Sequence, residues 1–186
     1  RRADGEAVGA GLGFFVEKSG LGPTDKVLVE VDAEGRIRVI CGASNLGQGV
    51  VTVLAQICAG TLGVDYTDID VVHGRTDAID EGYGSHASRT TVMTGEATRV
   101  AAKAIGEKLV SLAATRLQAK VASVEIVGKI ARNRDTGASI ALADVAGGAE
   151  DGIVRAEGRY DTTHMNYPYG VHAAVVVVDR GTGIAK

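Results

Sequence analysis

A change in hydrophobic period early in the chain constrains the fold more than any other feature. Residues 27–42, VLVEVDAEGRIRVICG, alternate apolar and polar side chains on both sides of Ala-Glu-Gly, which predicts a β-hairpin. From Val50 to Leu62 the apolar residues recur at helical spacing, and Gly63 is placed to end that helix. A strand pattern, DIDVVHG, follows at residues 68–74. This mixed order predicts an α+β fold, a mixed sheet with packed helices, rather than a doubly wound βαβ repeat.

The second half of the chain carries the longest helical pattern and several further strands. The predicted apolar face of the helix consists of Ala97, Val100, Ala101, Ala104, Ile105, Leu109 and Leu112. Residues 122–133 and 153–161 are predicted as strands, with a turn at 134–137 and a short helix or turn around 140–146. Residues 171–178, VHAAVVVV, are predicted as a buried strand that has no partner strand in the chain.

Length and composition favour one globular domain over residues 1–186. The chain is 45% hydrophobic and 23% charged, which suffices for a sizeable core. A formal net charge of -3 argues against a nucleic-acid partner, and no apolar run approaches the ~20 residues that span a bilayer. We also expect no signal peptide at the start of the sequence.

The cysteines and histidines do not form a metal-binding pattern. Cys41 and Cys58 lack CxxC or Cys/His spacing, so we interpret both as buried thiols. The four histidines, His73, His86, His164 and His172, are too scattered for a local metal motif. Among these four histidines, His86 differs in that it lies inside a glycine- and serine-rich loop, where the case for a purely structural role is weaker.

Two glycine-containing loops run directly into predicted helices. The first is NLGQGV at residues 45–50, and the second is GYGSHASRTTVMTG at residues 82–95. A helix N-terminus exposes unpaired N–H groups and partial positive charge, so two such loops suggest a ligand with several phosphate oxygens. The alternative is that their serines and threonines are ordinary helix caps. Neither loop matches GxxxxGK[ST], which disfavours a P-loop nucleotidase.

Four ordered segments together resemble the molybdopterin-binding large subunit of the xanthine dehydrogenase and aldehyde oxidase family, the molybdenum hydroxylases that include carbon monoxide dehydrogenase. They are GLGFFVEKSGLGP, the V-x-V-D-x-x-G-x-I-x-V-x-x-G hairpin, GQGVVTVLAQICAGTLGVDYTDIDVVHG and GYGSHASRTTVMTGEA. The resemblance extends from Gly11 to about Gly183, where YPYGVHAAVVVVDRGTG is similar to a strand and turn of the family.

The resemblance implies a molybdopterin dinucleotide, in its cytosine form, held by the two loops. The cofactor-binding residues it implies are Gly47, Gln48, Gly49, Ser85, Ala87, Ser88, Arg89, Thr90 and Thr91. Arg89 is expected to reach the diphosphate as the only cation of its loop. Replacing it should hardly change the stability of the fold, because arginine is seldom part of a core.

The resemblance also implies that this segment holds cofactor without carrying the chemistry. The family's general-base glutamate is expected beyond Lys186, so we expect no catalytic residue, no metal ligand and no activity in the isolated segment. The parent would hydroxylate an aldehyde or N-heterocycle, or oxidise carbon monoxide, and pass electrons to iron–sulfur and FAD partners. We expect it in the cytoplasm, with the periplasm as the alternative. Arg75 stands where the family commonly has Asp, which places any contact of that Asp in doubt.

Two other classes of function remain open on the sequence. One is a non-catalytic module that binds or matures the pterin without turnover. The other is a structural domain whose loops are only helix caps.

Overall fold

The structure is a computed structural model that describes residues 6–186, and the contacts divide them into two compact units. The larger unit is Gly20–Met165. The smaller unit contains the described residues up to Ser19 together with Asn166–Lys186. A single domain over residues 1–186 stays a prediction.

A four-stranded mixed sheet organises the larger unit. Its strand order is β4 (Ile69–Val72), β3 (Ile37–Cys41), β2 (Thr24–Asp32) and β8 (Ile153–Asp161). β2 is antiparallel to both of its neighbours, whereas β3 and β4 are parallel. The predicted α+β fold and the predicted β2–β3 hairpin are therefore confirmed. The hairpin turn closes where the Gly35 N–H donates to the Asp32 carbonyl at 2.9 Å, with Gly35 at a φ of 75°.

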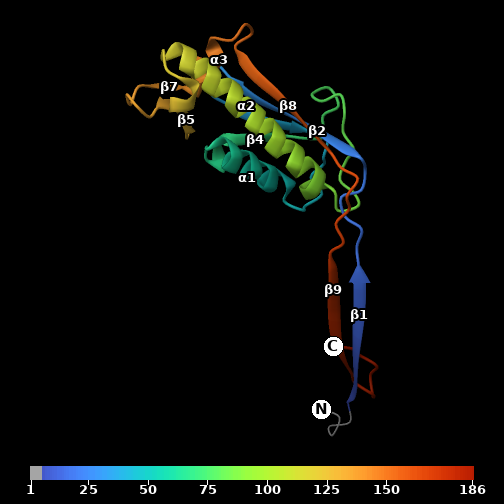
Figure 1. Ribbon diagram of the computed structural model, residues 1–186. Helices are drawn as coiled ribbons and strands as arrows, with labels where there is room; N and C mark the ends of the chain where they lie inside the picture. The colour runs from blue at the N-terminus through green and yellow to red at the C-terminus, as the bar shows by residue number, and fades with distance from the viewer. Residues whose placement is uncertain (1–5) are drawn as a thin grey trace. The chain divides into compact units, whose positions relative to one another are not determined.

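Two helices pack on this sheet and enclose the core (Figure 1). α1 (Val50–Leu62) connects β3 to the parallel strand β4, and Gly63 ends it in the left-handed conformation, as predicted. α2 (Gly95–Arg116) follows a π-helical turn, η3 (Thr90–Thr94), and lies against β2 and β8. The core contains Val27, Val29, Val31, Leu54 and Ile105, all at most 1% exposed.

The position of Gly158 determines which face of α2 is buried. A Cβ atom at Gly158 would lie 2.2 Å from the Ala101 nitrogen, so the helix backbone touches the strand there. The buried face is centred on Ala101, Ile105 and Leu109. The prediction that Leu112 belongs to it is wrong, because Leu112 is 42% exposed.

A small antiparallel sheet and several short elements complete the larger unit. β5 (Val124–Val127), β6 (Ile130–Asn133) and β7 (Ser139–Ala141) pair in that order, followed by α3 (Leu142–Gly147). The single strand predicted over 122–133 is wrong: Gly128, at a φ of 61°, divides it into a hairpin. Two short 3₁₀ turns, η2 (Tyr66–Asp68) and η4 (Val121–Ser123), precede β4 and β5.

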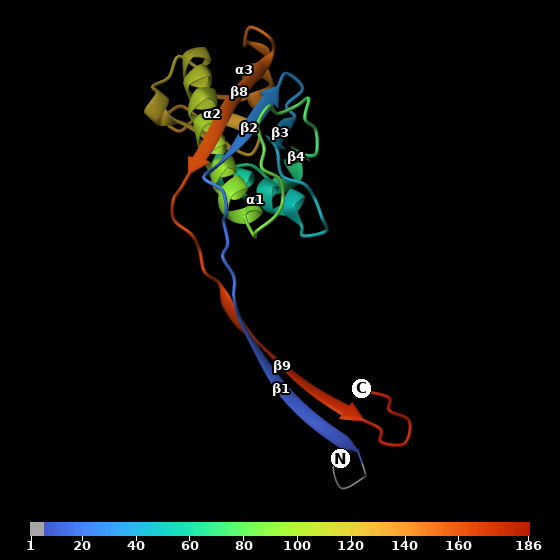
Figure 2. The same ribbon diagram turned by 90° about the vertical axis from the view of Figure 1, so that its right-hand side faces the viewer.

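The smaller unit is an antiparallel ribbon of β1 (Ala7–Val16) and β9 (Tyr169–Val178), both visible in Figure 2. The expectation that β9 has no partner strand is therefore wrong. Its expected burial is also wrong for most of its length, since Tyr169 is 83% exposed and Val175 is 67% exposed. Two strands form a single layer, so the apolar side chains of the ribbon lack a second layer in this unit.

Candidate functional site

The two glycine-containing loops meet because of the direction of the strands that precede them. β3 ends at Cys41 and leads through residues 42–49 into α1, while β4 ends at Val72 and leads through residues 73–89 into η3 and α2. Since β3 and β4 are parallel neighbours, both loops start from the same edge of the sheet. The two loops therefore form one site although residues that meet in it, such as Ser44 and Ser85, are 41 positions apart in the sequence.

Backbone contact and a shared hydroxyl hold the two loops together. A Cβ at Gly42 would lie 2.3 Å from the Gly82 Cα, so neither position has room for a side chain. The Ser44 N–H donates to Ser85 Oγ at 2.8 Å, and Ser85 Oγ donates to the Ser44 carbonyl at 2.7 Å. Thr90 Oγ1 lies 3.2 Å from the same Ser85 oxygen, as a third partner.

A cavity of about 190 Å³, which we call the loop cavity, opens between these segments. It is lined by Leu46, Gln48, Ser85, His86, Ala87, Ser88 and Thr90. It thus brings together Gln48 from the first loop and four of the residues predicted in the second. Gly47 and Gly49 flank Gln48 and are exposed, and Thr91 is exposed in the first turn of η3.

The helices that begin at this cavity have no side-chain caps. The cap position of α1 is Gly49, which has no side chain, and that of η3 is Arg89, whose guanidinium has no acceptor atom, so neither helix start has a side-chain cap. The serines and threonines of the two loops therefore do not occupy these two cap positions, contrary to the alternative interpretation. Because uncapped N–H groups keep their partial positive charge, both helix ends remain able to bind an anion.

Strained backbone shapes the second loop. Ala87 and Ser88 have φ values of 48° and 50°, a conformation that residues with a Cβ rarely adopt. Such strain persists only where the surrounding structure enforces it, and it is concentrated at binding and catalytic sites. The π-helical turn that follows is also a rare conformation that is frequent at functional sites.

The side chain of Gln48 closes its own loop. Its Oε1 accepts from the Leu46 N–H at 2.5 Å, and its Nε2 donates to the Ser44 carbonyl at 2.8 Å. An amide nitrogen carries two N–H groups, so one of them stays available after this bond is made. Gln48 can therefore shape the loop and donate to a ligand as well.

Arg89 does not lie where the sequence suggested. Its side chain is 0% exposed and forms an ion pair of 3.5 Å with Asp25, which is 1% exposed. The expectation that Arg89 lies outside the core is wrong. The expectation that its loss would hardly affect stability depended on that exposure, and the buried ion pair removes its basis. The signal was missed because the carbonyls that receive its hydrogen bonds, those of Leu21 and Thr24, lie 68 and 65 residues earlier.

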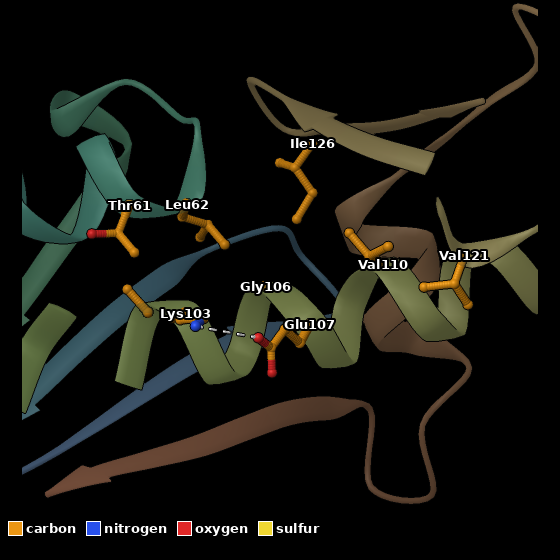
Figure 3. A pocket seen from close by; sticks show the side chains of 9 residues that line it. Thr61, Leu62, Lys103, Gly106, Glu107, Val110, Val121 and Ile126 are labelled. Atoms are coloured by element: carbon orange, nitrogen blue, oxygen red, sulfur yellow. Dashed lines mark ion pairs between the residues drawn. The ribbon is translucent and has the colours of Figure 1, made fainter. Parts of the chain in front are cut away.

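Two other cavities are lined by none of the predicted cofactor-binding residues. The cavity in Figure 3, about 310 Å³, lies between α1 and α2 and is mostly apolar, with Leu62, Val110 and Ile126 among its lining residues. A third, of about 430 Å³, is lined by Gly42, Ser44 and Gly82 from the loop contact, and by Arg75. Arg75 pairs there with Asp77, its Nε donating to Asp77 Oδ1 at 3.2 Å.

The described residues provide no protein-based metal centre. Among residues 6–186, no three His, Cys, Asp or Glu side chains are grouped to hold a metal ion. Burial raises the pKa of the Cys41 thiol to about 11 and that of the Cys58 thiol to about 12. Both cysteines are buried and unpaired, as predicted. Within the same residues, no helix combines the length and apolar character needed to cross a bilayer.

Comparison with known proteins identifies the family. The family model described as a molybdopterin cofactor-binding domain matches residues 1–186, and the chain belongs to this family. It is 39% identical, over 98% of its length, to the 6-hydroxypseudooxynicotine dehydrogenase complex subunit gamma of Paenarthrobacter nicotinovorans. It is 31% identical, over 97% of its length, to the carbon monoxide dehydrogenase large chain of Afipia carboxidovorans. These matches cover 24% and 25% of the two relatives, so the chain spans about a quarter of their length.

A solved structure with the same arrangement is quinoline 2-oxidoreductase from Pseudomonas putida 86. It is 28% identical, with a TM-score of 0.79, and the alignment covers 100% of this chain and 26% of that one. The relatives are oxidoreductases of the xanthine dehydrogenase and carbon monoxide dehydrogenase family. The family resemblance seen in the sequence is therefore confirmed.

The donor set of the loop cavity fits a long polar cofactor. The cavity offers the hydroxyl of Ser88, the second amide hydrogen of Gln48 and the ends of two helices. The hydroxyls of Ser85 and Thr90 also line it, but they donate within the protein, to the Ser44 carbonyl and to Ser85 Oγ, so towards a ligand they can only accept. Its described lining contains no Arg or Lys. A phosphate bound here would be stabilised by backbone N–H groups and hydroxyls rather than by an accessible cation.

Proposed function

We propose that the loop cavity binds the molybdopterin dinucleotide, in its cytosine form, of a molybdenum hydroxylase. The observation that carries the proposal is that Gln48 and Ser88, which lie on loops from two parallel strands, line one cavity at two helix ends without side-chain caps. The residues we assign to binding are Gly47, Gln48, Gly49, Ser85, Ala87, Ser88, Thr90 and Thr91. Arg89, whose side chain is 0% exposed, is not among them.

The protein residues bind and orient the cofactor. N–H groups at the start of α1, beside Gly49, would hold one anionic group, and those at the start of η3 would hold another. Ser88 would donate to the polar rim of the cofactor, while Ser85, which accepts from Thr90, keeps the two loops in register. The bound molybdenum supplies the redox chemistry by which a carbon centre receives oxygen from water.

The complete enzyme would hydroxylate an aldehyde or N-heterocycle, or oxidise carbon monoxide. Iron–sulfur and FAD partners would accept the electrons, since relatives of this chain are subunits of complexes: one is named as subunit gamma of a dehydrogenase complex and another as a large chain. We assign no catalytic residue to residues 1–186. A cytoplasmic location, with the periplasm as the alternative, belongs to the same proposal.

Cofactor content tests the proposal directly. The complete polypeptide that carries this segment is purified from a bacterial host, and molybdenum and released cytidine nucleotide are measured per subunit. We expect near-stoichiometric amounts of both. A non-catalytic pterin-binding module would contain both without turnover, whereas a structural domain would contain neither.

A matched pair of serine variants assigns the site. Ser88→Ala removes a hydroxyl that lines the cavity, and the loss of one hydrogen bond should weaken cofactor binding about two- to tenfold. Ser111→Ala, at an exposed position on α2, should leave binding unchanged. Equal molybdenum retention by the two variants after extended dialysis would count against the loop cavity as the binding site.

A further inference from the structure

Arg89 is a cation without solvent exposure in the middle of the proposed cofactor loop. Its Nε donates to the Leu21 carbonyl at 2.8 Å, and its Nη2 donates to the Thr24 carbonyl at 2.7 Å. Burying a charge is costly unless it is paired and hydrogen-bonded, so these contacts fix the position of the guanidinium. Nη1 is also buried and has no hydrogen-bond partner. The positive charge of Arg89 is therefore stabilised by its two carbonyl contacts and by Asp25.

The same guanidinium is linked to residues on both sides of the loop. Its Cζ lies 5.0 Å from the centre of the Tyr83 ring, at the start of the loop. Its ion-pair partner, Asp25, accepts a hydrogen bond of 2.6 Å from the Thr94 hydroxyl, at the end of η3. One buried side chain therefore connects both ends of the loop to Leu21 and to the first two residues of β2.

A ligand in the loop cavity cannot touch this guanidinium in the observed conformation. A bound molecule contacts atoms that are open to solvent in its absence, and Arg89 has no such surface. The backbone of Gly22 covers the guanidinium, since a Cβ there would lie 3.5 Å from Nε. A direct bond to a phosphate would require the Leu21 and Thr24 contacts to break.

We propose that Arg89 is a positioning residue: it holds the loop in its binding conformation from behind and does not contact the cofactor. In particular, it stabilises the strained backbone at Ala87 and Ser88, which directly precede it. The planar guanidinium suits this role because it spans two carbonyls at once, which the single ammonium group of lysine cannot reproduce in the same geometry. This inference rests on the proposed function in one respect, the identity of the ligand that the loop binds.

The test measures the loop itself, without cofactor. Arg89→Lys is made in the complete polypeptide and purified from cells unable to synthesise molybdopterin, and hydrogen exchange is followed by mass spectrometry. We expect exchange over residues 85–94 to be roughly ten- to a hundred-fold faster, with a lower melting temperature, because charge-assisted hydrogen bonds are lost. Arg99→Lys is the matched control, since Arg99 is an exposed residue of α2 paired with Glu96, and it should change neither quantity.

Two results would overturn the proposal. The first is that cofactor-free Arg89→Lys shows the same hydrogen exchange and melting temperature as the wild type, while the same variant made with cofactor loses molybdenum. That result would mean that Arg89 contacts the cofactor directly. The second result comes from Asp25→Asn, which is used if Arg89→Lys does not fold. Asparagine keeps an oxygen that can accept from Thr94, but it removes the negative charge that pairs with Arg89. Unchanged exchange of the loop in Asp25→Asn would contradict the proposal as well.

The outcomes also separate this inference from the proposed function. If Ser88→Ala retains wild-type molybdenum, the binding role of the cavity fails. The exchange measurement on Arg89→Lys contains no cofactor, so it still decides whether Arg89 positions the loop.

Discussion

Ser44 and Ser85 exchange two hydrogen bonds across the candidate site: the Ser44 N–H donates to Ser85 Oγ, and Ser85 Oγ donates to the Ser44 carbonyl. One hydroxyl thereby joins two loops that belong to different β–α connections. Its two bonds measure 2.8 and 2.7 Å, and both serines are only partly exposed. The relative position of the loops depends on this contact and on the adjacent Gly42–Gly82 approach.

Removal of the Ser85 hydroxyl should therefore loosen the site. We expect Ser85→Ala to lower the free energy of unfolding by about 1–3 kcal/mol, because the Ser44 N–H is left without its partner in a partly buried position. Cofactor retention should fall as well. Urea denaturation and molybdenum content measure the two effects. Ser88→Ala is the control for stability, since Ser88 is exposed; an equal loss of stability in both variants would contradict the role given to the Ser44–Ser85 contact.

The contact of α2 with β8 gives a prediction about stability alone. Gly158→Ala would place a Cβ 2.3 Å from the Ala97 carbonyl oxygen and 2.2 Å from the Ala101 nitrogen. Because helix backbone cannot move aside as a flexible side chain can, we expect destabilisation of about 3 kcal/mol, the upper part of the range for overpacking. Thermal and urea unfolding provide the measurement.

Gly60 offers the opposite outcome from the same substitution. It lies within α1, and a Cβ there would meet nothing within 4 Å. Gly60→Ala should stabilise the protein by up to about 1 kcal/mol, because alanine favours the helix. If Gly158→Ala proves as well tolerated as Gly60→Ala, the close packing of α2 on β8 is wrong.

The buried thiols predict how stability depends on alkaline pH. Burial raises the pKa of Cys41 and Cys58 from 9.0 to about 11 and about 12, so the folded state keeps protons that the unfolded state loses first. Their contribution to stability is complete below about pH 9 and is lost progressively as the pH rises towards 11 and 12. Urea denaturation between pH 8 and pH 11 should show this decline.

Removing both thiols isolates their share of the decline. The double variant Cys41→Ala and Cys58→Ala should have a smaller slope above pH 9 than the wild type, while lysine and tyrosine ionisation remains in both. Thiol reagents at pH 8 should react slowly with the folded wild type and quickly in urea, since both thiols are buried. Identical slopes in the two proteins would contradict the raised pKa values.

The parts of the fold that could be predicted from the sequence are those that depend on local sequence patterns. The β2–β3 hairpin, α1 with its Gly63 cap and most of α2 depend on periodicity and capping within a few turns of chain. The two loops were found because glycines, joined by hydroxyl residues in the second loop, directly precede helices. Their convergence was not predictable from periodicity, because it follows from the parallel pairing of β3 with β4.

Distant contacts account for what the sequence did not reveal. β1 was missed because Gly9, Gly11 and Gly13 interrupt its apolar alternation, and its partner is at the other end of the chain. The burial of Arg89 depends on carbonyls that precede it by more than sixty residues. Polar composition placed Arg89 in a loop correctly but could not reveal that its side chain points into the protein.

The packing of α2 on β8 also has a consequence for the order of events during synthesis. β2, β3, α1 and the cofactor loop all precede β8 in the chain, yet the helix that follows the loop rests on Gly158 of β8. Because non-local pairings form late, the loop acquires its final support only after residues 153–161 have left the ribosome. A cofactor bound by both loops would therefore meet the second loop in its supported conformation only once β8 has been made, although every residue that lines the loop cavity is synthesised before it.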